Sequence, residues 1–168
     1  VAAAQRALDG LLLDGYRRQA HVTLALGGFP CDTPQHADDF GPEALARQLA
    51  ALEASGVEAF TLQVGRLASF TSAPFLAVHD TDGGIARLRR ALTGDTAEPG
   101  GPYTPHVTVG LYAGAWPTAE VLPRLDAFDA GPPLSCTIDS VSLMRYAAPD
   151  IGGPLETLGR FRFGHGYG

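Results

Sequence analysis

The chain has 168 residues, of which 45% are apolar and 18% charged, and its formal net charge at neutral pH is −6. This size and composition are typical of one globular domain with a buried core, and the acidic balance argues against a broad basic surface for long nucleic acid. All 12 basic residues are arginine, which excludes mechanisms that depend on a lysine, such as P-loop binding of phosphate or Schiff-base catalysis.

The two cysteines, Cys31 and Cys136, lack zinc or CxxC spacing, and we interpret them as free thiols in a reducing compartment. No apolar run approaches the length of a membrane span, and residues 1–15 show no signal-peptide pattern. We therefore expect a cytoplasmic protein that does not bind membranes. We also expect it to be a monomer.

Apolar periodicity predicts both helices and strands along the chain. Helices are expected within 4–13, 42–56, 80–94 and 119–128, the last despite Pro123 inside it. Strands are expected at 19–26, 59–66, 72–79, 104–111, 134–146 and 155–163. This order predicts an α+β fold with an antiparallel sheet and helices outside it.

Three further features refine this prediction. The alternation of 134–146 changes phase between Ile138 and Val141, which indicates a bulge or break near Asp139. Glycine and proline in 94–102 are typical of a mobile loop. His165 follows the last strand, in a tail that we expect to be frayed.

The strands at 19–26 and 104–111 carry the same pattern, which reads HVTL in the first and HVTV in the second. Alternation places His21 and Thr23 on one face of their strand, and His106 and Thr108 on one face of theirs, with apolar residues opposite. The two histidines are 85 positions apart, close to half the chain, which indicates an internal duplication.

These motifs resemble those of the 2H phosphoesterases, and within them the bacterial RNA 2′,3′-cyclic phosphodiesterase (2′-5′ RNA ligase-like) family, over roughly residues 17 to 164. The resemblance implies one domain, 1–168, of two pseudo-symmetric lobes, each an antiparallel sheet with outer helices, around a central cleft. It also implies opening of 2′,3′-cyclic phosphates to 2′-phosphates, with 2′-5′ ligation in some members. His21, Thr23, His106 and Thr108 match the family's four catalytic positions.

The chemistry of these residue types supports that interpretation. Imidazole exists in both protonation states near neutral pH, so one histidine could act as base while the other acts as acid. The threonine hydroxyls could donate to the non-bridging oxygens of a phosphate. Neither a metal nor another cofactor is required.

Three other residues are candidates for substrate binding. Arg145 lies near a strand end, where the family often has a basic residue that could meet a phosphate, and a surface arginine is the alternative. Tyr103 and Phe29 flank the motif strands and could stack on a base, although core packing is the leading interpretation for Phe29.

The expected substrates are RNA ends or small cyclic nucleotides, and the acidic charge favours the small ones. The sequence leaves three other readings open. The same chemistry could act on an ADP-ribose-type or other small cyclic phosphoester. The fold could serve as a non-catalytic module that binds RNA ends. The two histidines could also bind a metal, although no third ligand with suitable spacing is evident.

Overall fold

The computed structural model describes residues 1–94 and 102–167, and it confirms the predicted α+β class. Most of the predicted loop at 94–102 lies outside the described residues. The helices are α1 (Ala2–Ala7), α2 (Pro42–Ala54), α3 (Gly84–Thr93) and α4 (Thr118–Asp126). The strands are β1 (Phe29–Pro30), β2 (Asp39–Phe40), β3 (Phe60–Ser69), β4 (Pro74–His79), β5 (His106–Thr108), β6 (Leu134–Ile138), β7 (Ser140–Arg145), β8 (Glu156–Arg162) and β9 (Gly166–Tyr167).

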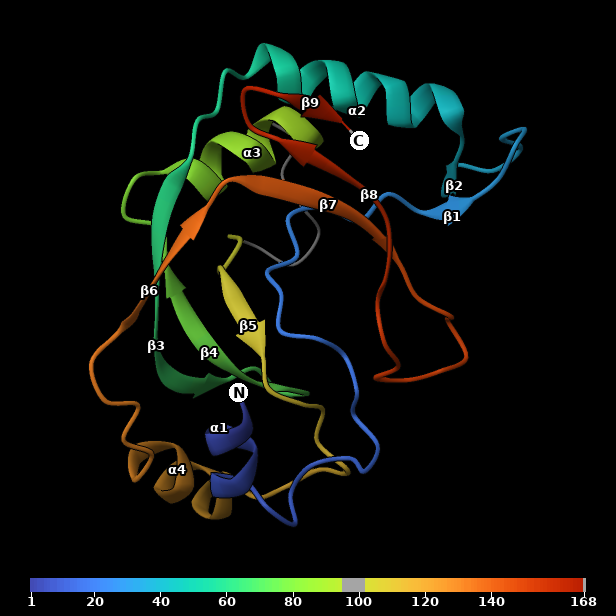
Figure 1. Cartoon of the computed structure of the whole chain (residues 1–168). Helices are drawn as coiled ribbons and strands as arrows, with labels where there is room; N and C mark the ends of the chain where they lie inside the picture. Colours follow the sequence, from blue (N-terminus) through green and yellow to red (C-terminus); the bar gives the residue numbers. More distant parts are fainter. Residues whose placement is uncertain (95–101, 168) are drawn as a thin grey trace.

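Two antiparallel sheets dominate the described fold. The larger sheet has the strand order β5-β4-β3-β6, and the smaller has the order β7-β8-β9. A short parallel pair, β1 and β2, lies apart from both. Helices α2 and α3 lie at one end of the molecule, and α1 and α4 lie at the opposite end (Figure 1).

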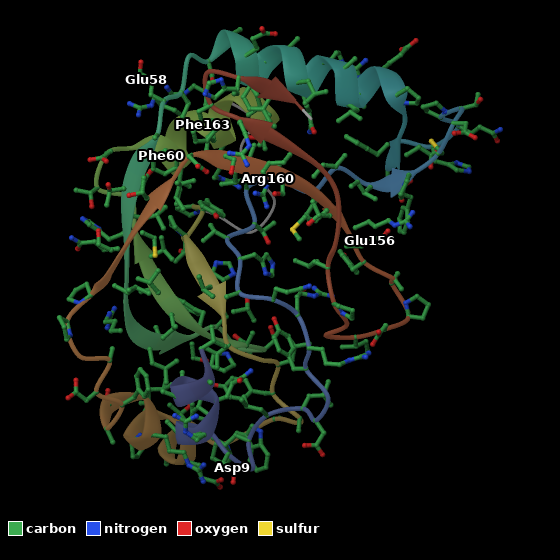
Figure 2. All side chains as sticks on the ribbon, in the orientation of Figure 1. Asp9, Glu58, Phe60, Glu156, Arg160 and Phe163 are labelled. Atoms are coloured by element: carbon green, nitrogen blue, oxygen red, sulfur yellow. The ribbon has the colours of Figure 1, made fainter. Side chains whose placement is uncertain are left out.

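The predicted break near Asp139 is confirmed, and it is the point where the chain passes from one sheet to the other. Strand β6 pairs with β3 and ends at Ile138, whereas β7 begins at Ser140 and pairs with β8. The two sheets also contact each other through two stacked rings (Figure 2). Phe60 begins β3 and Phe163 directly follows β8, and their ring centroids lie 6.1 Å apart. The alternation in the sequence therefore changes phase because the strand changes its partner sheet.

The predicted helix beginning at Pro42 is confirmed, with Pro42 and Glu43 in its first turn. Helix α3 is also confirmed, and the Asp80 carboxylate accepts a hydrogen bond of 3.0 Å from the Ala86 amide in its first turn. Helix α4 runs through Pro123, as expected. Helices α2 and α4 therefore begin and end close to their predicted bounds, whereas α3 begins at Gly84, later than the expected start at residue 80.

Helix α1 corrects the prediction for 4–13, because it covers only Ala2–Ala7. The chain turns at Gly10, whose φ of +79° is one that glycine adopts at little cost. Leu8 and Leu11 are nevertheless buried, as their apolar spacing indicated.

The prediction of a strand at 19–26 and the prediction of a frayed C-terminal tail also need correction. Residues 20–28 form no strand. Side chains of Tyr103 and Arg89, and not a neighbouring strand, donate to the carbonyls of Thr23 and Leu24. Residues 164–167 of the tail are not frayed. The chain turns at His165, whose amide donates to the Arg162 carbonyl at 3.1 Å, and continues as β9 against β8.

Candidate active site

The second motif lies in β5, an edge strand of the larger sheet. Val107 and Val109 are buried, at 7% and 0% exposure, whereas His106 and Thr108 are half-buried. Strand β4 pairs with β5 so that Ala77 lies opposite His106. The predicted alternation is therefore confirmed here, although β5 is shorter than the predicted 104–111.

Two aromatic side chains contact the His106 ring. The Phe70 ring lies 4.9 Å from it between centroids, at an interplanar angle of 82°, and the Phe75 ring lies 5.5 Å away. Phe75 is opposite Thr108 in the ladder, so strand pairing fixes its place beside the motif. One wall next to His106 is thus apolar and aromatic.

The segment that carries the first motif is not part of a strand, and side-chain hydrogen bonds hold it in place. Before it, the Gln19 side chain donates to the Leu155 carbonyl at 3.0 Å and accepts from the Leu155 amide at 2.8 Å. After His21, the Tyr103 hydroxyl donates to the Thr23 carbonyl at 2.6 Å. These side-chain contacts take the place of the predicted strand pairing.

Tyr103 also connects the two motifs, because it lies three residues before His106. The Arg89 guanidinium covers its ring at 3.5 Å from the centroid and donates to the carbonyl of Leu24. The contact between Arg89 and the Tyr103 ring therefore links the backbone of the first motif to the segment that carries the second motif.

Both motif histidines make the same local hydrogen bond. In each, Nδ1 lies 2.7 Å from the backbone carbonyl two residues earlier, Gln19 for His21 and Thr104 for His106. A carbonyl oxygen can only accept, so Nδ1 must carry the proton in both rings. Each Nε2 is then left to take up or release a proton, and this orientation by a second group is typical of acid-base histidines.

The motif threonines match their histidines in exposure. Thr23 and Thr108 are both half-buried. Within residues 1–94 and 102–167, neither hydroxyl nor either histidine Nε2 makes a hydrogen bond. These four groups are therefore open to a ligand.

Arg145 ends β7 and forms a two-pronged ion pair with Glu156, with bonds of 2.8 and 3.2 Å. Hydrogen bonding from the guanidinium lowers the pKa of the Glu156 carboxyl, and the same bond raises the pKa of Arg145. Glu156 directly follows Leu155, the residue bonded to Gln19. Arg145 therefore lies close to the start of the first motif, with its guanidinium already occupied by a carboxylate.

The structure changes the interpretation of the two aromatic candidates, Phe29 and Tyr103. Phe29 is 60% exposed in β1, so core packing is wrong for this residue. One face of the Tyr103 ring is covered by Arg89. Phe70, which directly follows β3, was missed by sequence reasoning. A single phenylalanine in the segment Ser-Phe-Thr-Ser carries no motif, and only the strand pairing places it beside His106.

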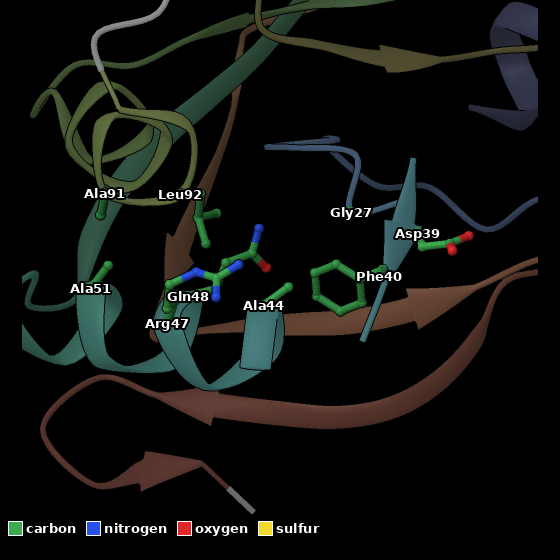
Figure 3. Close-up of a pocket in the computed structure, with 9 residues that line it drawn as sticks. All are labelled: Gly27, Asp39, Phe40, Ala44, Arg47, Gln48, Ala51, Ala91 and Leu92. Atoms are coloured by element: carbon green, nitrogen blue, oxygen red, sulfur yellow. The ribbon is translucent and has the colours of Figure 1, made fainter. Parts of the chain in front are cut away.

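A separate pocket of about 350 Å³ lies at the far end of the first-motif segment. It is lined by Gly27, Asp39, Phe40, Ala44, Arg47, Gln48, Ala51, Ala91 and Leu92. Figure 3 shows the Phe40 ring within this group and the Asp39 carboxylate pointing away from the other labelled side chains. Hydrogen bonds from the backbone amides of Gln35 and His36 lower the pKa of Asp39. No motif residue lines this pocket.

Within 1–94 and 102–167, no three His, Cys, Asp or Glu side chains gather in a way that could hold a metal ion. Within the same ranges, no helix combines the length and the apolar character needed to cross a bilayer.

A family model described as the 2′-5′ RNA ligase superfamily matches residues 2–150. Because this match covers most of the chain, the protein belongs to that superfamily, which is the 2H phosphoesterase superfamily. A comparison with curated proteins found no match. The superfamily is one of phosphoesterases and ligases that act on RNA or cyclic phosphates. The two His-x-Thr motifs lie inside the matched range, and β8 and β9 lie beyond it.

Proposed function

We propose that this protein is a metal-independent phosphodiesterase that opens 2′,3′-cyclic phosphates, on RNA ends or nucleotides, to 2′-monophosphates. The observation that carries the proposal is the pair of identical hydrogen bonds from Nδ1 to a backbone carbonyl, at 2.7 Å in both motifs. Two rings fixed in the same tautomer can share the work of proton transfer on one phosphate.

In the proposed reaction, Nε2 of one histidine removes a proton from water, and the water oxygen attacks phosphorus. The bond from phosphorus to O3′ breaks, and Nε2 of the other histidine gives its proton to O3′. The products are a 2′-phosphate and a free 3′-hydroxyl. Proton exchange with solvent then restores both rings.

The threonines have a distinct part in this proposal. Thr23 and Thr108 donate from their hydroxyls to the non-bridging oxygens, where negative charge increases as the water oxygen attacks phosphorus. If a 5′-hydroxyl replaces water as the nucleophile, the same steps form a 2′-5′ linkage and release the 3′-hydroxyl. Ligation thus needs no ATP in this scheme.

The test is hydrolysis of the four 2′,3′-cyclic mononucleotides in excess EDTA, with the product isomer identified by phosphorus NMR. We expect turnover that EDTA does not reduce, and a 2′-monophosphate as product. Loss of activity with EDTA would instead favour a metal site, and a 3′-monophosphate would contradict the proposed bond cleavage. An RNA oligomer with a cyclic end, run in parallel, compares a polymer with a mononucleotide.

A further inference from the structure

Phe70 is a large apolar side chain that stays 40% exposed beside the second motif. Its ring centroid lies 4.9 Å from that of His106. A single exposed apolar residue is ordinary on a protein surface. This one differs because it contacts a ring that we assign to proton transfer.

The Phe70 ring is also held in a defined place. It stacks on Phe75 at 4.2 Å between centroids and 26° between planes, and Phe75 is only 6% exposed. The Phe70 amide donates to the Ala73 carbonyl at 2.9 Å, and the Ser69 hydroxyl donates to the Phe70 carbonyl at 2.6 Å. An aromatic surface fixed in advance loses little conformational entropy when a ligand stacks on it.

We propose that Phe70 forms a nucleobase subsite, on which the base of the substrate stacks while the cyclic phosphate lies at His106 and Thr108. This inference rests on the proposed function, and it adds the residue that holds the base of the substrate. In a nucleoside 2′,3′-cyclic phosphate, one ribose joins base and phosphate. A ring on which the base stacks must therefore lie no farther than about one ribose from the histidine that contacts the phosphate. The distance of 4.9 Å between the Phe70 and His106 ring centroids meets this requirement.

The two aromatic residues chosen from sequence fit this role less well. Phe29 is 60% exposed in β1, a strand that carries neither motif histidine. Tyr103 and Phe70 each have one ring face covered, by Arg89 and by Phe75. The difference is that the Tyr103 hydroxyl is committed to the Thr23 carbonyl, whereas the Phe70 ring contacts the His106 ring. Because every base has a π-face, stacking on Phe70 would accept all four bases with modest preference.

The experiment compares a substrate that has a base with one that lacks it. The kinetic constants of wild type and Phe70→Leu are measured on adenosine 2′,3′-cyclic phosphate and on glycerol 1,2-cyclic phosphate. The adenosine substrate should lose about 5- to 100-fold in kcat/KM, mostly through a higher KM. The glycerol substrate should change by less than about twofold, because it makes no stacking contact.

Two variants control for the hairpin and for the ring. Thr71→Ala alters an exposed neighbour in the same turn and should leave both substrates unaffected. Phe70→Tyr keeps an aromatic face and should restore the adenosine constants. An equal loss on both substrates would overturn the subsite and make Phe70 a support for His106. No loss on either substrate would also overturn it.

Failure of the proposed function is distinguishable from failure of the subsite. If wild type hydrolyses neither substrate, adenosine 2′-monophosphate serves as a binding probe in saturation-transfer NMR. Transfer to the base protons in wild type, lost in Phe70→Leu and retained in Thr71→Ala, would support the subsite without turnover. Absence of transfer in wild type would overturn the subsite.

Discussion

The two motif segments carry the same residue types but are held in different ways. The second lies in a strand whose backbone pairs with β4, and its histidine packs against two phenylalanine rings. The first has no strand, and the side chains of Gln19, Tyr103 and Arg89 secure it. The two copies of the motif thus share the hydrogen bond of the histidine and differ in the contacts around it.

This difference predicts which segment tolerates mutation. A β-ladder spreads its support over many backbone groups, so no single side chain is decisive for His106. The position of His21 depends on a few individual contacts, and each can be removed by one substitution. The predictions below test this comparison, from the largest expected effect to the smallest.

The histidines should matter equally despite their different surroundings. His21→Ala and His106→Ala should each reduce turnover of a cyclic nucleotide by about 10²–10⁴-fold, because each removes one proton-transfer group. Steady-state kinetics measure the loss, and circular dichroism checks the fold. His79→Ala, at the exposed end of β4, is the matched control. Full activity in either motif variant would remove that histidine from the mechanism.

The threonines test whether the hydroxyls or the packing of their segments matters. Thr23→Val and Thr108→Val keep the side-chain shape and should lower kcat by about tenfold to a thousandfold through lost phosphate donors. Thr137→Val, an exposed threonine of β6, controls for the change in strand propensity. Unfolding of the motif variants in thermal melts would instead assign these threonines to packing.

Tyr103→Phe removes the hydroxyl that holds the first motif and leaves the aromatic ring in place. We expect kcat to fall by about 2- to 10-fold, the usual value of one hydrogen bond, because His21 is less well positioned. Nitrogen-15 NMR of the imidazoles should show a change at His21 and none at His106. Tyr146→Phe, whose ring lies under Arg18, is the control. Equal changes in both imidazoles would contradict the proposed difference in support.

The ion pair between Arg145 and Glu156 should give the smallest effect. Glu156→Gln frees the guanidinium near the first motif, and we expect KM for a cyclic nucleotide to fall by about twofold. Arg145→Ala should raise KM instead, and Arg162→Ala, on the exposed part of β8, should not change it. An unchanged KM in both Glu156→Gln and Arg145→Ala would make Arg145 a surface residue.

The same pair has a defined pH dependence. Arg145 lowers the folded-state pKa of Glu156 below its unfolded value. The stabilisation is therefore present above the unfolded pKa and is lost as pH falls through the lowered one. Thermal melts of wild type and Glu156→Gln should differ slightly at neutral pH and converge in acid. Both side chains are largely exposed, so the difference is small.

The sequence by itself determined the class of fold, most elements and the four motif residues. Alternation and helical spacing are local properties, so they identified β3, β4 and α2, and the phase change at Asp139 marked the passage between the sheets. The repeated His-x-Thr pattern indicated the superfamily that the family model then showed.

Only the tertiary structure decided how the motifs are held and what surrounds them. The alternating pattern of 19–26 predicted a strand, yet contacts from Tyr103 and Arg89, distant in sequence, bind its backbone instead. Phe70 gained its candidate role because the β3–β4 hairpin and the pairing of β4 with β5 place it against His106. Such contacts join residues far apart in the chain, and no local pattern records them.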